Sequence, residues 1–346
     1  MIPKRCDMLV LEIEKLNTVY RTQRGDVRAV EDVSFAIREG LNFGLVGESA
    51  CGKSTVLKSV IGVLPPNAFV PGGRILFKGR DLTALDEEER RKLRWKQISM
   101  ITQSALNSLD PVHKVGDQIV EAIQIHETMD RTTAKQRVEE MFALVGIDSK
   151  RFREYPHQFS GGMRQRAIIA MSLILKPSLV IADEPTTSLD VIVQDQILKN
   201  MRRLQDMLGF SMLLVTHDMA LVIENCDHVG VMYGGKIIEL GPKREVILQP
   251  FHPYTMGLKN SFPNILDRRS ELISIPGVPP VLMGELRGCR FFSRCPFGTE
   301  RCSREIPPLI EVGPAHRAAC HYTDRAEEMR NKAALSETWL NMARDP

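Results

Sequence analysis

The sequence predicts an α/β fold, and three patterns along the chain carry this prediction. A loop of mostly small residues, 47–55, follows an apolar stretch and precedes a helix-forming one. Two later runs, Ser178–Asp183 and Ser211–Thr216, are short and almost continuously apolar, as buried parallel strands are. The helix-like segment Val191–Leu208 separates these runs. Strand, helix and strand in alternation predict a parallel sheet with helices packed on it.

The N-terminal part of the chain is rich in predicted strands. Apolar and polar residues alternate over Leu9–Val19 and again over Val30–Ile37, as in strands with one buried face. Arg74–Phe77 follows a turn at Gly72-Gly73. These runs predict an antiparallel β subdomain.

Downstream of this region the pattern becomes helical. Apolar residues recur at the spacing of one helix face, behind a predicted cap at Thr132-Thr133. These apolar positions are Val138, Met141, Phe142 and Val145. We therefore predict an inserted helical subdomain, about residues 95–175, within a first domain that comprises residues 1–249.

The C-terminal part changes character twice. His228–Tyr233 and Lys236–Leu240 flank Gly234-Gly235, a pair that supplies the positive φ of a tight hairpin turn. From about Pro250 the sequence becomes rich in proline and cysteine, which prevents long regular elements. We predict a small, irregular, cysteine-rich extension over residues 250–325 and a helical or flexible tail over residues 326–346.

Composition limits the function of this 346-residue chain. Its 43% hydrophobic and 26% charged residues are ordinary for a globular protein. A formal net charge of +3 is too small to predict a nucleic-acid surface. Residues 1–14 carry no long apolar run, and Lys176-Pro177 interrupts the most apolar later stretch. We therefore expect no export signal and no membrane span, so that any membrane role comes through partner subunits.

The loop at residues 47–55 matches G-x-x-x-x-G-K-[ST], a phosphate-binding loop. Small residues let successive backbone N–H groups turn towards phosphate oxygens, aided by the helix N-terminus. Lys53 is expected to neutralise the β- and γ-phosphates, and Ser54 to offer a hydroxyl to Mg²⁺. The helix N-terminus is also expected to favour the thiolate of Cys51. The predicted nucleotide contacts are Gly47, Glu48, Ser49, Ala50, Cys51, Gly52, Lys53, Ser54 and Thr55.

Two adjacent carboxylates end the predicted strand Leu179–Asp183. Asp183 is expected to hold the Mg²⁺ shell beside the phosphate loop. Glu184 is expected to accept a proton from the attacking water or to orient that water. Together with the loop, the two carboxylates predict a P-loop NTPase core, to which the antiparallel β subdomain and the inserted helical subdomain are added. The predicted activity is that of an ATPase that uses ATP and Mg²⁺.

A further motif, Phe159–Arg166, reads Phe-Ser-Gly-Gly-Met-Arg-Gln-Arg ahead of a helical run. Ser160 can cap that helix, and the two glycines leave its N-terminus open to an anion. The loop, a Gln, Ser-Gly-Gly, Asp-Glu and a later His follow one another at the spacing of a known family. From Leu9 to about Leu240 the chain resembles ABC transporter ATPases. The resemblance implies that two subunits pair head to tail around two ATP molecules.

The resemblance also assigns residues to the partner subunit's nucleotide. Those of the Ser-Gly-Gly helix are Ser160, Gly161, Gly162 and Met163. Asp190, in Ser188-Leu189-Asp190, would meet the opposing subunit. Ala50-Cys51, Met163 and Ser188 replace commoner residues of the family, but none of these replacements removes a required charge.

Three residues receive roles at the chain's own nucleotide. Tyr20 would stack on adenine, or else only pack within its strand. Gln103 would touch Mg²⁺ and link the site to the helical subdomain that grips a permease, or else be a surface glutamine. His217 would bond the γ-phosphate and position the water, or else be a buried core histidine.

The extension contains four closely spaced cysteines, Cys289, Cys295, Cys302 and Cys320. In a cytosolic chain such a cluster favours metal or iron–sulfur ligation over disulfides. The tail also resembles the C-terminal extension of oligopeptide/dipeptide-type ATPases, through His252-Pro253-Tyr254-Thr255 and residues 275–280, and Phe159–Arg166 agrees with their D-type subunit. This resemblance implies a structural [4Fe–4S] cluster on the four thiolates. Tetrahedral Zn²⁺ and unligated packing are the alternatives.

These observations predict an ATP-hydrolysing subunit of an ABC importer that powers uptake of di- or oligopeptides. The expected partners are two transmembrane permeases, a second ABC ATPase that is a paralogue or an identical copy, and indirectly an external substrate-binding protein, with no nucleic acid. The predicted location is peripheral, at the cytoplasmic face of the cell membrane. Oligosaccharide uptake and a soluble ABC ATPase unlinked to transport are the open alternatives.

Overall fold

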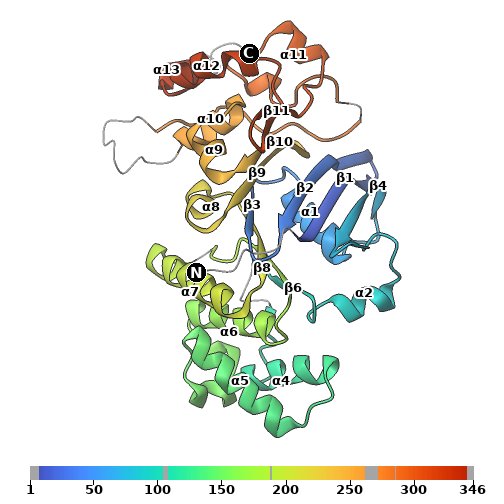
Figure 1. Cartoon of the computed structure of the whole chain (residues 1–346), viewed down its shortest axis with the longest axis vertical. Coiled ribbons are helices and arrows are strands. Elements are labelled where there is room, and N and C mark those ends of the chain that lie inside the picture. Colours follow the sequence, from blue (N-terminus) through green and yellow to red (C-terminus); the bar gives the residue numbers. More distant parts are fainter. Residues whose placement is uncertain (1–7, 104–107, 188, 262–271, 285, 341–346) are drawn as a thin grey trace. The chain divides into compact units, whose positions relative to one another are not determined.

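The computed structural model describes residues 8–103, 108–187, 189–261, 272–284 and 286–340. The chain divides into two compact units. Figure 1 labels most of their helices and strands. The first unit comprises Met1–Leu11, Ile37–Leu41 and Phe77–Leu214. The second unit comprises Glu12–Ala36, Asn42–Leu76 and Val215–Pro346.

The first unit contains short, buried strands. β8 (Ser211–Thr216), β7 (Leu179–Asp183) and β6 (Ile98–Ile101) are neighbours in this order, and β6 runs parallel to β7. Every residue of β7 and β8 is buried, which explains their apolar sequences. The predictions for β7 and β8 are confirmed. β6 was not predicted, because four residues are too few for a recognisable period.

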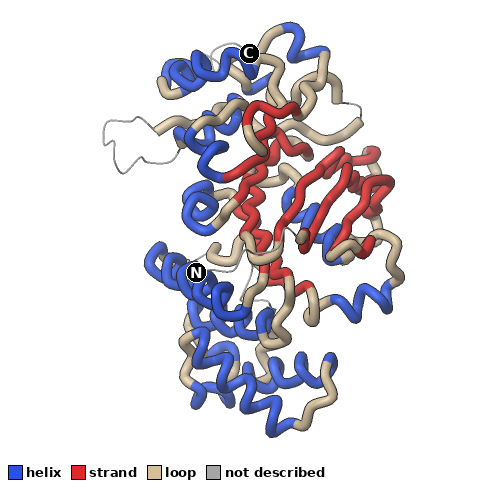
Figure 2. Tube along the Cα trace, viewed as in Figure 1, coloured by secondary structure: helices blue, strands red, loops and turns tan. Residues whose placement is uncertain are grey.

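Helices supply most of the rest of the first unit (Figure 2). The predicted apolar residues of α5 are buried, but the cap is Asp130, whose carboxylate accepts from the backbone N–H groups of Thr132 and Thr133. Within the described ranges, no helix has the length and hydropathy that a bilayer crossing requires. The elements of this unit are β5 (Arg80–Asp81), α2 (Glu87–Leu93), α4 (Val115–His126), α5 (Arg131–Val145), α6 (Gly161–Leu173), α7 (Val191–Leu208) and 3₁₀ turns at Ser149–Arg153 and Pro156–Gln158.

The β subdomain belongs mainly to the second unit. β2 (Gly25–Arg38), β1 (Leu9–Thr22) and β4 (Ala68–Phe77) are neighbours in this order. A two-residue turn at Gln23-Arg24 joins β1 to β2, as in an antiparallel hairpin. All three strands were predicted, and each is longer than predicted. The predicted turn at Gly72-Gly73 is wrong, because both glycines lie within β4, where a Cβ on Gly73 would lie 2.3 Å from the carbonyl oxygen of Lys15.

The second unit also carries a sheet in the order β11-β12-β10-β9-β3. β3 (Asn42–Val46) is fully buried and runs parallel to β9 (His228–Tyr233). β9 and β10 (Lys236–Pro242) form the predicted hairpin around Gly234-Gly235, whose φ angles are 53° and 82°. Non-glycine residues rarely adopt such angles, so the glycine pair fixes this turn.

The proline-rich extension contributes regular structure to this same sheet. β12 (His316–Ala318) pairs antiparallel with β10, and β11 (Ile310–Gly313) pairs with β12. The helices of the second unit are α1 (Lys53–Ile61), α8 (Met219–Asn225), α9 (Lys243–Leu248), α10 (Pro253–Asn260), α11 (Glu300–Arg304), α12 (Ala326–Ala333) and α13 (Ser336–Leu340), with 3₁₀ turns at Phe292–Arg294 and Thr323–Arg325. The residues after 325 are therefore helical as far as they are described.

A buried carboxylate ties the extension to β10. Glu239 has no exposed surface and accepts from the backbone N–H groups of Phe251 at 2.8 Å and His252 at 3.0 Å. Its other contact is with Nε2 of His316, at 2.8 Å. A buried carboxylate without such partners would strongly destabilise the fold, so Glu239 fixes both the start of α10 and β12 relative to β10.

Candidate functional site

The phosphate loop connects β3 to α1, and its glycines are required by close backbone contacts. A Cβ on Gly47 would lie 2.1 Å from the carbonyl oxygen of Met232. A Cβ on Gly52 would lie 2.3 Å from the carbonyl oxygen of Ala29, and Gly52 also has a φ of 107°. A side chain at either position would therefore displace backbone, so the two motif glycines fix the shape of the loop.

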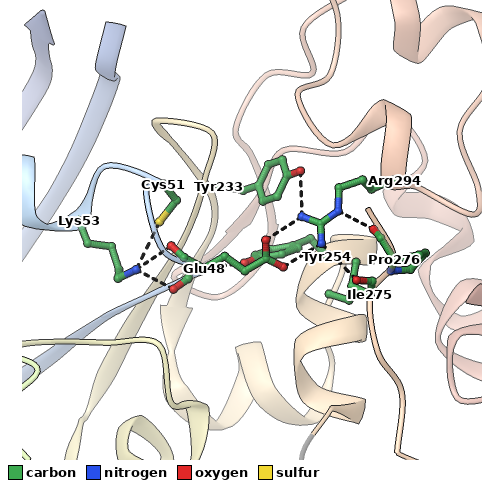
Figure 3. Close-up of polar contacts among 9 residues, drawn as sticks. Glu48, Cys51, Lys53, Tyr233, Tyr254, Ile275, Pro276 and Arg294 are labelled. Carbon is green, nitrogen blue, oxygen red and sulfur yellow. Dashed lines mark hydrogen bonds and ion pairs between the residues drawn. The ribbon is translucent and has the colours of Figure 1, made fainter. Parts of the chain in front are cut away.

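The loop holds its own lysine. Lys53 is only 6% exposed, and Nζ donates to the carbonyl oxygens of Gly47 at 2.7 Å and Glu48 at 2.8 Å (Figure 3). Because these carbonyls belong to the loop itself, the position of the ammonium depends on the conformation of the loop. The structure thus places the predicted phosphate-neutralising charge within the loop.

The prediction of a reactive Cys51 is wrong. The Cys51 side chain is 1% exposed, with Sγ 3.7 Å from Nζ of Lys53. Burial raises the pKa of the thiol, and the nearby ammonium of Lys53 lowers it by less. The expectation of a thiolate rested on the nearby helix N-terminus alone. It left out desolvation of the buried sulfur, which disfavours the thiolate.

The loop has two partners that sequence reasoning missed. The backbone N–H of Glu48 donates to the Tyr254 hydroxyl at 2.9 Å. The Glu48 carboxylate forms a two-pronged ion pair with Arg294, with Nη1 2.7 Å from Oε2 and Nη2 3.1 Å from Oε1 (Figure 3). Arg294 lies 246 positions further along the chain, so no local pattern reveals this contact.

The remaining predicted nucleotide residues of the second unit lie around α1 and after β8. The hydroxyl of Tyr20, on β1, is 3.3 Å from Oγ1 of Thr55. Ser49, Ala50 and Ser54 are exposed. His217 follows β8 and is exposed, which excludes the alternative of a buried core histidine. The adenine role of Tyr20 and the γ-phosphate role of His217 stay predictions.

In the first unit the structure brings Gln103 and Glu184 together. Nε2 of Gln103 donates to Oε2 of Glu184 at 2.8 Å, although 81 positions separate them. The Thr187 hydroxyl donates to the same oxygen at 3.0 Å. Glu184 has a φ of 44°, unusual for a non-glycine residue, and follows Asp183, the buried last residue of β7. Gln103 is exposed and hydrogen-bonded to Glu184, so its role at Mg²⁺ stays a prediction.

The predicted partner-site residues cap and pack two helices of the first unit. Oγ of Ser160 accepts from the backbone N–H of Met163 at 3.3 Å, which confirms the cap on α6. A Cβ on Gly162 would lie 2.8 Å from Cγ1 of Val193, so glycine allows α6 and α7 to approach. The exposed Asp190 caps α7 by accepting from Val193 N–H at 3.0 Å. Gly161 begins α6, and Ser188 lies outside the described residues.

The four cysteines of the extension line one small cavity of about 20 Å³. They are free thiols, and burial raises the pKa of Cys289 to about 11 and that of Cys320 to about 11. Aromatic residues also line the cavity, namely Phe291, Phe292, Phe297 and Tyr322. Across the part of the chain that the structure describes, no three His, Cys, Asp or Glu side chains are arranged to hold a metal ion. The expected iron–sulfur centre, like its zinc alternative, is therefore not confirmed.

Comparison with known families assigns both parts of the chain. Residues 30–187 match the family described as ABC transporter. Residues 238–302 match the family described as oligopeptide/dipeptide transporter, C-terminal region.

Full-length relatives agree with these matches. The chain is 44% identical to the dipeptide transport ATP-binding protein DppD of Bacillus subtilis, over 92% of this chain and 96% of the relative. It is 42% identical to the oligopeptide transport ATP-binding protein OppD of Escherichia coli, over 90% of this chain and 92% of the relative.

Solved structures agree on the fold. CbiO1 from Clostridium perfringens, part of the ABC transporter complex CbiONQ, is similar with a TM-score of 0.62 and 27% identity. That alignment covers 70% of this chain and 92% of CbiO1. The ATP-binding cassette MJ0796 has the same fold, with a TM-score of 0.61 and 22% identity over 68% of this chain and 99% of that one. The predicted P-loop α/β fold is thereby confirmed.

Proposed function

Because this chain belongs to the ABC transporter family, as an ATP-binding subunit with the C-terminal region of its oligopeptide/dipeptide branch, we propose that it powers peptide import. The observation that carries this proposal is similarity over 90–92% of the chain, extension included, to proteins named for dipeptide and oligopeptide transport. Those names support peptides as cargo over oligosaccharides. They also support a transport subunit over an ATPase unlinked to transport.

The ATP molecule is bound by the phosphate loop and hydrolysed with the help of Glu184. Lys53 and the loop N–H groups contact the phosphates, and Tyr20 stacks on the adenine. Glu184 accepts the proton of the attacking water, and the Gln103 amide and the Thr187 hydroxyl orient its carboxylate. His217 donates a hydrogen bond to the γ-phosphate. The positive φ of Glu184 fits a residue held in one functional conformation.

Three side chains offer oxygen donors to Mg²⁺, the hydroxyl of Ser54, the amide oxygen of Gln103 and the carboxylate of Asp183. Oxygen donors are those that Mg²⁺ prefers. When bound, Mg²⁺ supplies positive charge that stabilises the phosphates during transfer.

The chain works as one half of an ATPase pair on two permeases. Ser160, Gly161, Gly162 and Met163 at the start of α6 bind the partner subunit's nucleotide, because a capped helix N-terminus with bare glycines suits an anion. Asp190 meets the partner. The pairing subunit is a paralogue or a second copy, and the assembly lies at the cytoplasmic face of the membrane, where an external binding protein supplies substrate from the other side.

The four cysteines of the extension would hold the structural [4Fe–4S] cluster that we propose for this chain. The chemistry of the donor set fits, since four free thiols from separate positions line one cavity. When bound, the cluster would cross-link four positions within residues 289–320. Cys289, Cys295, Cys302 and Cys320 would be its ligands, and the aromatic residues around them would exclude water.

The proposal is tested by uptake in a strain that lacks this subunit and is complemented with variants. Wild-type chain should restore uptake of labelled di- and oligopeptides, and Glu184→Gln should not. Asp195→Asn, at an exposed residue of α7 that pairs with the exposed Lys199, is a matched carboxylate-to-amide control and should restore uptake. Restored uptake of labelled oligosaccharides but not of peptides would contradict the peptide assignment, and co-purification with two polytopic proteins should accompany uptake.

A further inference from the structure

Arg294 of the extension contacts the phosphate loop. Arg294 lies beside Cys295 in the extension, and its guanidinium meets the carboxylate of Glu48 edge to edge, at 2.7 and 3.1 Å (Figure 3). The Arg294 side chain is 5% exposed and that of Glu48 is 27% exposed. Two parallel hydrogen bonds with little solvent access are the strong form of such a pair.

The guanidinium of Arg294 also forms hydrogen bonds with residues other than Glu48. Nε donates to the carbonyl oxygen of Pro276 at 2.7 Å, and Nη2 donates to that of Ile275 at 3.3 Å. Nη1 also donates to the Tyr233 hydroxyl at 3.2 Å. The extension and β9 thus fix the guanidinium independently of Glu48. The position of Arg294 therefore determines the position of the Glu48 carboxylate.

A second contact fixes the backbone at the same residue. The Tyr254 hydroxyl that accepts from Glu48 N–H belongs to α10, and the Tyr254 side chain is fully buried. Its ring packs against Tyr233 with centroids 4.7 Å apart and against Phe291 with centroids 5.3 Å apart. Both the main chain and the side chain of Glu48 are therefore held by residues outside the loop.

The position of Glu48 matters for the loop in two ways. Its carbonyl oxygen accepts from Nζ of Lys53, so a shift of Glu48 would move the ammonium. Its carboxylate puts a negative charge into a loop whose ligand is anionic, and an unpaired carboxylate there would repel phosphate. The guanidinium of Arg294 removes that repulsion.

We propose that Arg294 is a positioning residue for ATP binding, which fixes Glu48 and neutralises its charge so that the phosphate loop accepts the nucleotide. This inference rests on the proposed function, in that ATP is taken as the ligand of the loop. The extension then does more than pack against the rest of the second unit, because it prepares the phosphate loop for ATP.

A second ion pair in the second unit provides a matched control. Arg290 also belongs to the extension, and it pairs with Glu31, which also contacts Lys236 at 2.9 Å. The Arg290 side chain is 5% exposed, as is that of Arg294, but its carboxylate partner lies on β2 and not in the phosphate loop. Loss of this pair weakens docking of the extension without exposing a charge inside the loop.

The test measures dissociation constants of MgATP, MgADP and adenosine for the purified full chain, with thermal melting as a check on folding. Arg294→Met should weaken MgATP binding about tenfold, MgADP less and adenosine least, because the repulsion scales with phosphate charge. Adding Glu48→Gln to Arg294→Met should restore affinity to within about threefold of wild type, since the unpaired charge is gone. Arg290→Met should stay within about threefold of wild type.

Three results would overturn the proposal: unchanged MgATP affinity in Arg294→Met, no recovery in the double variant, or an equal loss in Arg290→Met. If Arg294→Met does not fold, Arg294→Lys replaces it, and its affinity should fall by less than tenfold because the charge stays but the two-pronged geometry is lost. Wild-type chain that fails to bind MgATP would instead refute the proposed function.

Discussion

The phosphate loop and the end of β7 each carry a glutamate, and the structure holds the two in different ways. Glu48 pairs with the guanidinium of Arg294, whereas Oε2 of Glu184 accepts from the neutral Gln103 amide and Thr187 hydroxyl. A guanidinium cancels the charge of a carboxylate, while neutral donors orient a carboxylate and leave its charge in place. We propose that the same residue type shapes a binding loop in one region and serves proton chemistry in the other.

The largest expected effect comes from removing the charge at the end of β7. Glu184→Gln keeps the shape of the side chain but removes the base, so turnover at saturating ATP should fall by about 10²-fold or more while ATP binding persists. Steady-state ATPase assays on the assembled transporter measure this. Near-normal turnover would show that Glu184 is not the base. The proposed difference in role between Glu184 and Glu48 would then be wrong.

Removing the charge of Lys53 should act on the other region. Lys53→Met should weaken MgATP binding by about 10²-fold, because the phosphates lose a cation and the carbonyls of Gly47 and Glu48 lose their donor. Equilibrium binding with a fluorescent ATP analogue tests this. Lys58→Met, an exposed position later on α1, is the control and should bind as wild type does.

The proposed orienting role of Gln103 gives a finer test of the contrast. Gln103→Ala leaves the charge of Glu184 but removes one of its donors, so turnover should fall about tenfold. Gln103→Glu would place a second carboxylate beside Glu184 and should lower turnover further. Turnover in Gln103→Ala equal to that of wild type would mean that the hydrogen bond between them has no role in hydrolysis.

Substitution of the cysteines that line the cavity should change the metal content of the protein far more than its affinity for ATP. Anaerobically purified wild-type chain should contain about four irons, and Ser at Cys289, Cys295, Cys302 or Cys320 should abolish iron binding. ATP affinity should change by less than about threefold as long as Arg294 is intact. Iron analysis and visible absorbance provide the measurement, and protein that holds one zinc ion would contradict the cluster.

The smallest effect is expected at Cys51. Because burial raises the pKa of its thiol above the usual 9.0, the neutral thiol prevails at neutral pH and alkylation by iodoacetamide should be slow. The rate should rise only above pH 9, as the thiolate forms. Peptide mass spectrometry after timed labelling measures this, with denatured chain as the reference. Rapid labelling of the folded chain at pH 7 would show that Cys51 is not shielded.

Contiguous motifs account for most of what could be predicted. The fold follows from periodicity, and the phosphate loop follows from a pattern in which the spacing itself is the signal. The strand ending in two carboxylates predicted the role of Glu184, and the resemblance predicted that of Gln103, although their separate segments gave no sign that these side chains touch. The strands β11 and β12 of the extension were not predicted, because they are too short to show a period. The many prolines around them also indicated irregular structure.

Long-range side-chain contacts account for what could not be predicted. Glu48 occupies a variable position of the loop motif, so nothing in the motif points to Arg294 or Tyr254. Likewise, the sequence around Cys51 suggests an accessible helix N-terminus, whereas burial depends on how the loop packs. Desolvation and ion pairing between distant residues emerge only from the fold.

The most direct test of the two-glutamate account is the ATP dependence of ATPase activity, measured side by side for Glu184→Gln and Arg294→Met in the assembled transporter. The account predicts a split: Glu184→Gln lowers kcat with little change in ATP affinity, and Arg294→Met raises KM about tenfold with kcat largely kept. A fall in kcat in Arg294→Met with unchanged KM, or a rise in KM as the main effect of Glu184→Gln, would contradict it.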